Sequence, residues 1–386
     1  MTLTSKDVEQ KHPKITVLIP TFNRAAYLAE SLDSILVQTL PPAQLIVVDD
    51  GSTDDTRSVC DAYRSKIEYL QLNQLGKSSA INYGLKKASG DYIWIFDDDD
   101  VAFPDALKRF VEPLENGPEF GFSYSTFFYT ANDEKTNRLG RILYELKIPD
   151  LETRGFLIPL LEWNFLGGAS LFARASCYKK VGDFDSELLR SQDYEMAIRL
   201  ARRFRGVRVP GRPTFHYRQH EGIRGANRDR FSGAIRLQKW FNYNQKFFRK
   251  LYCQIPIAEY LPPGVSTDDK MRQALLQRIT VMSYKLLIPE MVKDLRELAL
   301  LPDQTPFSQE EYRIIRNMIM KSPYEDIGTI LGHPEFFGEI RRLAASSTVI
   351  RLLRTKVLRA LLARYRSRPR LDKLLEILYR IFHLYF

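Results

Sequence analysis

The sequence predicts an α/β fold with a mostly parallel sheet and helices on both of its faces. In the first third of the chain, short β-branched and apolar runs alternate with helical patterns, which is typical of parallel strands joined by helices. Polar or acidic residues follow three of these runs. Because parallel strands end at one edge of a sheet, we expect those residues to meet there, where ligands bind in such folds.

Strands are expected at 15–20, 45–48, 67–72 and 92–96, each a short apolar run. The helix after the first strand ends before Pro41-Pro42, a second opens at Asp54-Asp55-Thr56, and a third covers 78–88. Further strands are expected at 121–129, 170–174, 207–209 and 214–217, and an amphipathic helix at 191–203. From about residue 231 the sequence is helical in character.

The chain has 386 residues and a net charge of +10, from 57 Lys/Arg and 47 Asp/Glu. All of that excess lies in residues 341–386, which hold 12 Lys/Arg and two acids. The remainder is neutral, so we expect no nucleic-acid partner. We predict three regions: a domain at 1–230, a helical extension at 231–340 and a basic amphipathic tail at 341–386.

Other protein classes are disfavoured by simple features of the sequence. No apolar run is long enough for a conventional membrane-spanning helix, and the polar N-terminus lacks an apolar signal core. Three widely spaced cysteines fit a reducing cytoplasm better than a disulfide framework. Gly76-Lys77-Ser78 ends like a P-loop, but Gln71 stands where that motif needs glycine, and no G-x-G-x-x-G follows a strand.

Four consecutive aspartates, Asp97–Asp100, follow the strand at 92–96. Like charges this close are costly unless a cation neutralises them, and oxygen ligands at a diphosphate site suit Mg²⁺ or Mn²⁺. The alternative is a solvated acidic loop or the start of a helix. Asp49-Asp50-Gly51-Ser52 by itself is more typical of a turn than of a contact to a base or ribose.

Taken in order, Pro20–Arg24, Val47–Ser52 and Asp97–Asp100 with Pro104-Asp105 resemble family 2 glycosyltransferases of the GT-A fold. The resemblance covers about residues 14–220. It implies inverting transfer of one sugar from a nucleotide-diphosphate donor, a UDP-sugar by expectation, with Mg²⁺ or Mn²⁺ on the diphosphate. Carried over by position, it implies that the nucleotide contacts Pro20, Thr21, Phe22, Asp50, Lys77, Asp97 and Asp98, and that the metal contacts Asp99.

The same resemblance assigns the general base to Asp193, at the start of the helix at 191–203. Gln192 replaces the first acid of the family's pair, and an acid stabilising the helix N-terminus is the alternative role for Asp193. Trp163 resembles an acceptor-side wall, with a core tryptophan as the alternative. His220 lies in the segment that closes over the diphosphate, and a structural histidine is the alternative.

The tail at 341–386 combines basic charge with a helical apolar stripe, Ile350, Leu353, Val357 and Leu361. This pattern suits binding to an anionic membrane surface, whereas packing on the body is the alternative. We therefore expect an enzyme at the inner face of the cell membrane that glycosylates a saccharide or lipid-linked acceptor in surface polysaccharide assembly. A sugar-1-phosphate nucleotidyltransferase and a non-catalytic nucleotide-sugar-binding module are the alternative functions.

Overall fold

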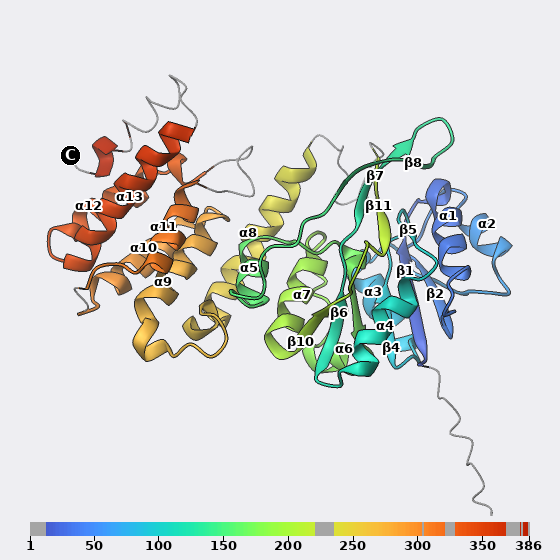
Figure 1. Ribbon diagram of the computed structural model, residues 1–386. Coiled ribbons are helices and arrows are strands. Elements are labelled where there is room, and N and C mark those ends of the chain that lie inside the picture. Colours follow the sequence, from blue (N-terminus) through green and yellow to red (C-terminus); the bar gives the residue numbers. More distant parts are fainter. Residues whose placement is uncertain are drawn as a thin grey trace, which may run out of the picture. The chain divides into compact units, whose positions relative to one another are not determined.

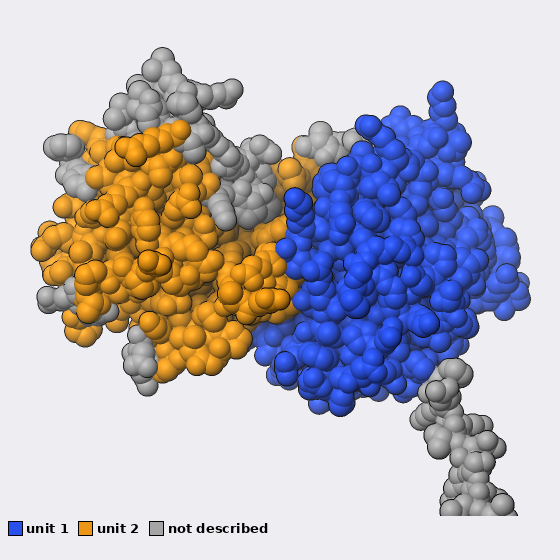
Figure 2. All heavy atoms as spheres, in the orientation of Figure 1, with its two compact units in different colours: residues 1–148, 166–233 blue, residues 149–165, 234–386 orange. Residues whose placement is uncertain are grey.

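The computed structural model describes residues 13–220, 235–302, 305–320, 329–367, 379 and 381–384. The chain divides into two compact units, coloured separately in Figure 2. Unit 1 comprises Met1–Ile148 and Leu166–Gly233, and unit 2 comprises Pro149–Phe165 and Ala234–Phe386. The segment Pro149–Phe165, which we assigned to the first domain, therefore groups with the helical unit.

Unit 1 is built on a seven-stranded sheet with the strand order β10-β6-β9-β4-β1-β2-β3 (Figure 1). Its strands are β1 (Ile15–Thr21), β2 (Gln44–Asp49), β3 (Glu68–Gln71), β4 (Tyr92–Ile95), β6 (Phe120–Tyr124), β9 (Leu171–Arg174) and β10 (Arg205–Arg208). Neighbouring strands are parallel except at β9, which is antiparallel to both β4 and β6. The predicted α/β fold with a mostly parallel sheet is confirmed.

The helices of unit 1 follow the expected alternation with strands. They are α1 (Ala25–Leu36), α2 (Thr56–Ala62), α3 (Lys77–Lys87), α4 (Ala106–Asn116), α6 (Ala175–Val181) and α7 (Gln192–Arg203). Every residue of β1 is buried, as a central strand covered on both faces requires. The apolar run that predicted β1 therefore also forms the centre of the core.

A smaller sheet with the order β5-β11-β7-β8 completes unit 1. It consists of β5 (Val101–Ala102), β7 (Phe128–Asp133), β8 (Arg138–Glu145) and β11 (Phe215–Gln219). Our prediction of one strand over 121–129 is wrong, because that stretch is divided between β6 and β7 in different sheets. Between them, the backbone N–H of Ser125 donates to the carbonyl oxygen of Ser170, and the chain then enters the second sheet.

Unit 2 is helical in its described residues. Its helices are α5 (Leu157–Glu162), α8 (Arg236–Gln254), α9 (Thr267–Ser283), α10 (Ile288–Ala299), α11 (Gln309–Met320), α12 (Pro334–Ala344) and α13 (Thr348–Ser367). None of the helices in the described part of the chain combines the length and apolar character needed to cross a bilayer.

The apolar stripe predicted for the basic tail lies on α13. Its four residues are buried, and α13 contacts α10, α11 and α12. Our expectation that this stripe is exposed for a membrane surface is wrong, because the stripe forms part of the core of unit 2. Most of the apolar segment 374–386 lies outside the described residues.

Candidate active site

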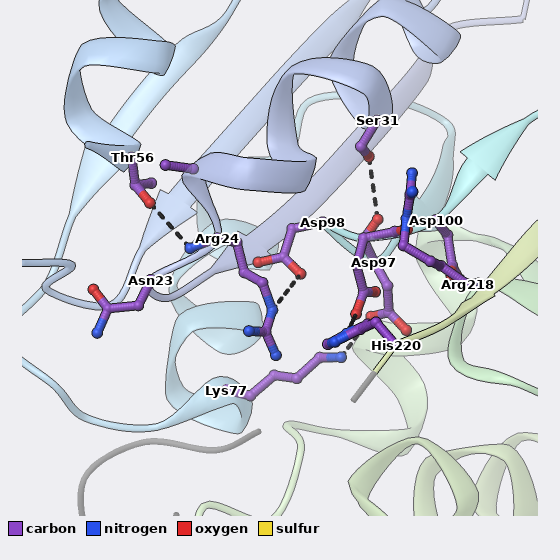
Figure 3. A network of polar contacts seen from close by, with 12 residues as sticks. Asn23, Arg24, Ser31, Thr56, Lys77, Asp97, Asp98, Asp100, Arg218 and His220 are labelled. Atoms are coloured by element: carbon purple, nitrogen blue, oxygen red, sulfur yellow. Dashed lines mark hydrogen bonds and ion pairs between the residues drawn. The ribbon is translucent and has the colours of Figure 1, made fainter. Parts of the chain in front are cut away.

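The first two of the four acids that follow β4 face basic side chains. Lys77 Nζ, at the first residue of α3, lies 2.5 Å from Asp97 Oδ1. Arg24 Nε lies 3.8 Å from Asp98 Oδ1. Figure 3 shows both cationic side chains extending toward the acids. The loops after β1 and β3 thus supply positive charge to the acidic cluster.

Asp99 and Asp100 are in contact with the end of β11. His220 Nε2 lies 3.0 Å from Asp99 Oδ2, and the backbone N–H of Arg218 donates to Asp100 Oδ1 at 3.0 Å. Asp99, Asp100 and His220 are all buried. Residues about 120 positions apart in sequence therefore form one polar cluster, part of which Figure 3 shows.

Burial and mutual repulsion change the protonation of this cluster. Burial, and then the charge of Asp99, raises the pKa of Asp98 to about 7, against the opposing charge of Arg24. Burial and the charges of Asp99 and Asp97 hold the pKa of Asp100 well above its ordinary value. Asp100 Oδ2 is buried and has no hydrogen-bond partner among the described residues. Asp98 and Asp100 therefore ionise less readily than ordinary aspartates, and a nearby cation would favour their charged forms.

Arg218 is a buried residue of this site that the sequence analysis did not single out. Its side chain is fully buried. Its guanidinium donates to the carbonyl oxygen of Asp99, to Asn132 Oδ1 at 2.8 Å and to Glu30 Oε2 at 2.5 Å. The available signal was an arginine directly after the strand predicted at 214–217, and the structure extends that strand to Gln219. A charged side chain buried there needs partners. These partners come from α1, the acidic loop and the β7–β8 hairpin.

Asp50 shapes the loop that leads to Lys77. Its two carboxylate oxygens accept the backbone N–H groups of Leu75 and Gly76, each at 2.7 Å. Burial raises the pKa of Asp50, and these two hydrogen bonds act against that effect. Gly76 has φ +93°, a conformation that favours glycine, and α3 begins at the next residue. A nucleobase contact at Asp50 would use the remaining lone pairs of oxygens that already hold this loop.

Asp193, in the first turn of α7, lines a pocket together with Lys77 and Asp97. Gly168 lines the pocket too. A Cβ atom at this position would lie 3.0 Å from Asp97 Oδ2, so a larger residue would displace the Asp97 carboxylate slightly. Burial raises the pKa of Asp193, the charge of Lys77 opposes this, and the charge of Asp97 adds to it. A carboxylate with a raised pKa is a stronger base, which suits proton abstraction near neutral pH.

Comparison with known proteins shows what this chain resembles. Residues 16–179 match the family model for Glycosyl transferase family 2. An uncharacterized glycosyltransferase of Rickettsia conorii is 32% identical over 206 residues, which are 52% of this chain and 33% of that protein. The chain thus spans about a third of the length of this relative.

Two solved structures resemble this chain in fold. S. aureus TarS 1–349 in complex with UDP-GlcNAc is 17% identical, with a TM-score of 0.51 over 92% of each chain. The mannosyltransferase PcManGT from Pyrobaculum calidifontis, in complex with GDP-Man and Mn²⁺, is 16% identical, with a TM-score of 0.50. That match covers 93% of this chain and 89% of the other. At these identities the likeness concerns the fold, and it supports the predicted GT-A fold.

In unit 1, the predicted base-binding residues Pro20, Thr21 and Phe22 lie at the carboxyl end of β1. Pro20 and Thr21 are buried, and Phe22 is half-buried. The next residue, Asn23, has φ +52° and accepts the backbone N–H of Thr53 at 2.7 Å through Oδ1. The loops after β1 and β2 are therefore tied together at the edge where the acidic cluster lies.

Trp163, the predicted acceptor-side residue, belongs to unit 2, whereas the acidic cluster belongs to unit 1. It follows α5 directly, is half-buried, and its ring centroid lies 6.3 Å from that of Phe165. Its contact with an acceptor stays a prediction. Within unit 1 the structure brings together Lys77, Asp97, Asp98, Asp99, Asp193 and His220.

Asp99 and His220 are the side chains of unit 1 that best fit a divalent cation. They present one carboxylate oxygen and one imidazole nitrogen side by side. No group of three or more His, Cys, Asp or Glu side chains in the described residues is arranged to hold a metal. Two protein donors suit Mg²⁺ or Mn²⁺ when substrate phosphates and water supply the other ligands. A cation here would also favour the ionised forms of the neighbouring buried acids Asp98 and Asp100.

Proposed function

We propose that this chain is an inverting glycosyltransferase that moves one sugar from a nucleotide-diphosphate donor, a UDP-sugar, to a saccharide or lipid-linked acceptor. The observation that carries the proposal is the pocket shared by Asp193, Lys77 and Asp97. It joins a carboxylate of raised pKa to the acidic cluster that follows β4. A base and a donor site must lie this close for one sugar to pass between them.

The donor would bind along the edge where β1, β2 and β4 end. Pro20, Thr21, Phe22 and Asp50 would hold the base, and Lys77, Asp97 and Asp98 would contact the rest of the nucleotide. Asp99 and His220 would hold Mg²⁺ or Mn²⁺, which neutralises charge on the departing diphosphate when bound. The UDP-GlcNAc bound to TarS and the GDP-Man and Mn²⁺ bound to PcManGT support this choice of ligands.

Asp193 would supply the base for the transfer step. It takes the proton of the acceptor hydroxyl as that oxygen forms a bond to the anomeric carbon. The bond from the anomeric carbon to the diphosphate oxygen breaks on the opposite side, so the configuration inverts. Lys77 lies beside Asp97 and would remain charged, because the charge and hydrogen bond of Asp97 outweigh burial and raise its pKa. That positive charge would attract the donor phosphates.

Asp193→Asn tests the proposal, because asparagine keeps the size and hydrogen bonding of the side chain but not its basicity. A thermal-stabilisation screen of UDP- and GDP-sugars with Mn²⁺ selects the donor, and release of nucleoside diphosphate with a panel of saccharide acceptors measures turnover. We expect turnover to fall by about 10²–10⁴-fold while donor affinity is retained. Asp183→Asn, at an exposed acid before α7, is the control. Wild-type turnover in Asp193→Asn would remove Asp193 from the mechanism.

We also propose that the basic C-terminal region binds an anionic membrane surface by charge. Support comes from the 12 Lys/Arg among residues 341–386 and from the exposed side of α13, which carries Arg351, Arg359 and Arg366. Deleting α13 would remove buried core, so the sharper test reverses these three charges to glutamate. We expect the variant to float less with phosphatidylglycerol vesicles, and equal flotation of variant and wild type would contradict the proposal.

A further inference from the structure

Three tyrosines stand side by side across the smaller sheet of unit 1. The strand register places Tyr217 of β11 opposite Tyr129 of β7, and Tyr129 opposite Tyr144 of β8. Their ring centroids are 5.4 Å apart in the first pair and 4.4 Å apart in the second. Directly opposed residues on neighbouring strands point to the same face. These three rings, here called the tyrosine row, therefore cross the strands that Figure 1 shows beside one another.

Sheet stability accounts for only part of the tyrosine row. Cross-strand aromatic pairs stabilise sheets, and this explains the half-buried rings of Tyr129 and Tyr217. Tyr144, on the edge strand, is 58% exposed, and the adjacent Ile142 and Leu143 are 50% and 42% exposed. Ile142 is opposite Thr130 and so faces the other side of the sheet, which leaves Tyr144 as the exposed ring of the row. Tyrosine combines a large apolar face with a polar hydroxyl, which is typical of binding surfaces. Packing within the sheet therefore does not explain why the Tyr144 ring on the edge strand β8 is exposed.

The edge strand is poorly suited to pairing with a further strand. The register between β7 and β8 is irregular at two places, and β8 carries Arg138 and Arg141. Irregular register and charged side chains are features that oppose strand addition at a sheet edge. Because Tyr129 is stacked on Tyr144 and lies edge-to-face with Tyr217, the exposed ring of Tyr144 is the part of the row that a ligand can pack against. The edge of β8 thus suits a ligand that packs on this ring better than a chain that pairs with the backbone.

The tyrosine row is connected to the pocket of the proposed reaction through one buried phenylalanine. The ring centroid of Phe127 lies 5.0 Å from that of Tyr129 and 5.2 Å from that of Tyr217. The same ring lies 2.9 Å from where a Cβ atom of Gly167 would be. Gly167 and the next residue, Gly168, both line the pocket that contains Asp193. The row and the pocket are thus neighbours within unit 1.

We propose that the tyrosine row binds sugar units of the acceptor glycan, beside the unit that receives the new sugar. This inference rests on the proposed function and names the acceptor as a saccharide chain. Aromatic faces pack against the C–H faces of pyranose rings, and the phenol hydroxyls can donate to and accept from sugar hydroxyls. A lipid chain would gain nothing from three hydroxyl groups.

The test compares three variants of β8 on a printed array of bacterial and synthetic oligosaccharides, with UDP and Mn²⁺ present. Tyr144→Ala removes the exposed ring and should weaken binding to the glycans that the wild type selects by about tenfold. Tyr144→Phe keeps the ring face and should retain most of the binding. Ile142→Ala is the matched control, because Ile142 is opposite Thr130 and so faces the other side of the sheet with similar exposure.

Calorimetry with UDP and Mn²⁺ separates the outcomes. Wild-type glycan binding by Tyr144→Ala would overturn the inference, and so would a wild-type protein that binds UDP but no oligosaccharide. Binding of acyl-chain probes lost only in Tyr144→Ala would assign the row to a lipid and would also overturn it. If the wild type bound neither UDP nor any nucleotide-sugar, the proposed function itself would fail.

Discussion

The Nε of Arg218 donates a hydrogen bond to the backbone carbonyl oxygen of Asp99 at 2.7 Å. Asp99 is the residue expected to contact the cation, so Arg218 fixes the position of that residue through its backbone. The other guanidinium nitrogens are held by Glu30 and Asn132. Arg218 is therefore a positioning residue that joins the acidic loop to α1 and to the β7–β8 hairpin.

Arg218→Lys should weaken binding of UDP in the presence of Mn²⁺ by about 10–100-fold, the usual effect of losing a group that orients a metal ligand. Lysine keeps the charge, but its donors sit on a single nitrogen, which cannot reach the three partners that the planar guanidinium spans. Titration calorimetry measures the affinity with and without Mn²⁺. Arg212→Lys is the control, because Arg212 is more exposed and pairs with Asp105 outside the cluster. Equal UDP affinity in Arg218→Lys and Arg212→Lys would show that the guanidinium hydrogen bonds of Arg218 do not position Asp99.

Asp99→Ala should abolish the contribution of Mn²⁺ to UDP binding, because the cation loses its carboxylate ligand. Titration of UDP with Mn²⁺ and with EDTA measures that contribution directly. Asp61→Ala, at an exposed acid on α2, should leave it unchanged. The assignment of the metal to Asp99 would be wrong if Mn²⁺ strengthened UDP binding equally in both variants.

Asp193 should make the protein less stable as pH rises above 3.8. Burial raises its pKa in the folded protein, so between the unfolded and folded values the native state binds more protons than the unfolded state. The free energy of unfolding therefore falls with rising pH through this window. Asp193→Asn should accordingly have a higher Tm than wild type at pH 7, with the gap closing near pH 3. Thermal scans at both pH values check this, and a lower Tm of Asp193→Asn at pH 7 would contradict it.

Lys285, in unit 2, should make the free energy of unfolding depend on pH in the opposite direction. It is fully buried, its Nζ donates to the carbonyl oxygen of Glu162 at 2.9 Å, and burial lowers its pKa to about 7. Between this value and the ordinary 10.5 the unfolded state binds more protons, so stability rises with pH from about 7. Lys285→Met should flatten that rise in urea denaturation, and Lys293→Met, at an exposed lysine on α10, should not. Identical pH profiles of wild type and Lys285→Met would refute the prediction.

Much of the site could be anticipated because its parts are local in sequence. The acids at 97–100 follow a strand directly, and Lys77 begins a helix after a glycine turn. Parallel topology then brings such strand ends to one edge. The partners of these groups could not be anticipated in the same way. His220 lies 121 residues from Asp99, and Arg218 lies 188 residues from Glu30.

The apolar periodicity of the sequence by itself determined the alternation of strands and helices in unit 1, because period and β-branching act within a few residues. It also predicted a helical apolar stripe in the tail at 341–386, made by Ile350, Leu353, Val357 and Leu361. Only the tertiary structure decided that this stripe is buried against α11 and α12, and that residues 121–129 are divided between two sheets. Likewise, the tyrosine row exists only through the register of β11, β7 and β8. Register and packing depend on which distant segments meet, and the order of residues within one segment does not encode that.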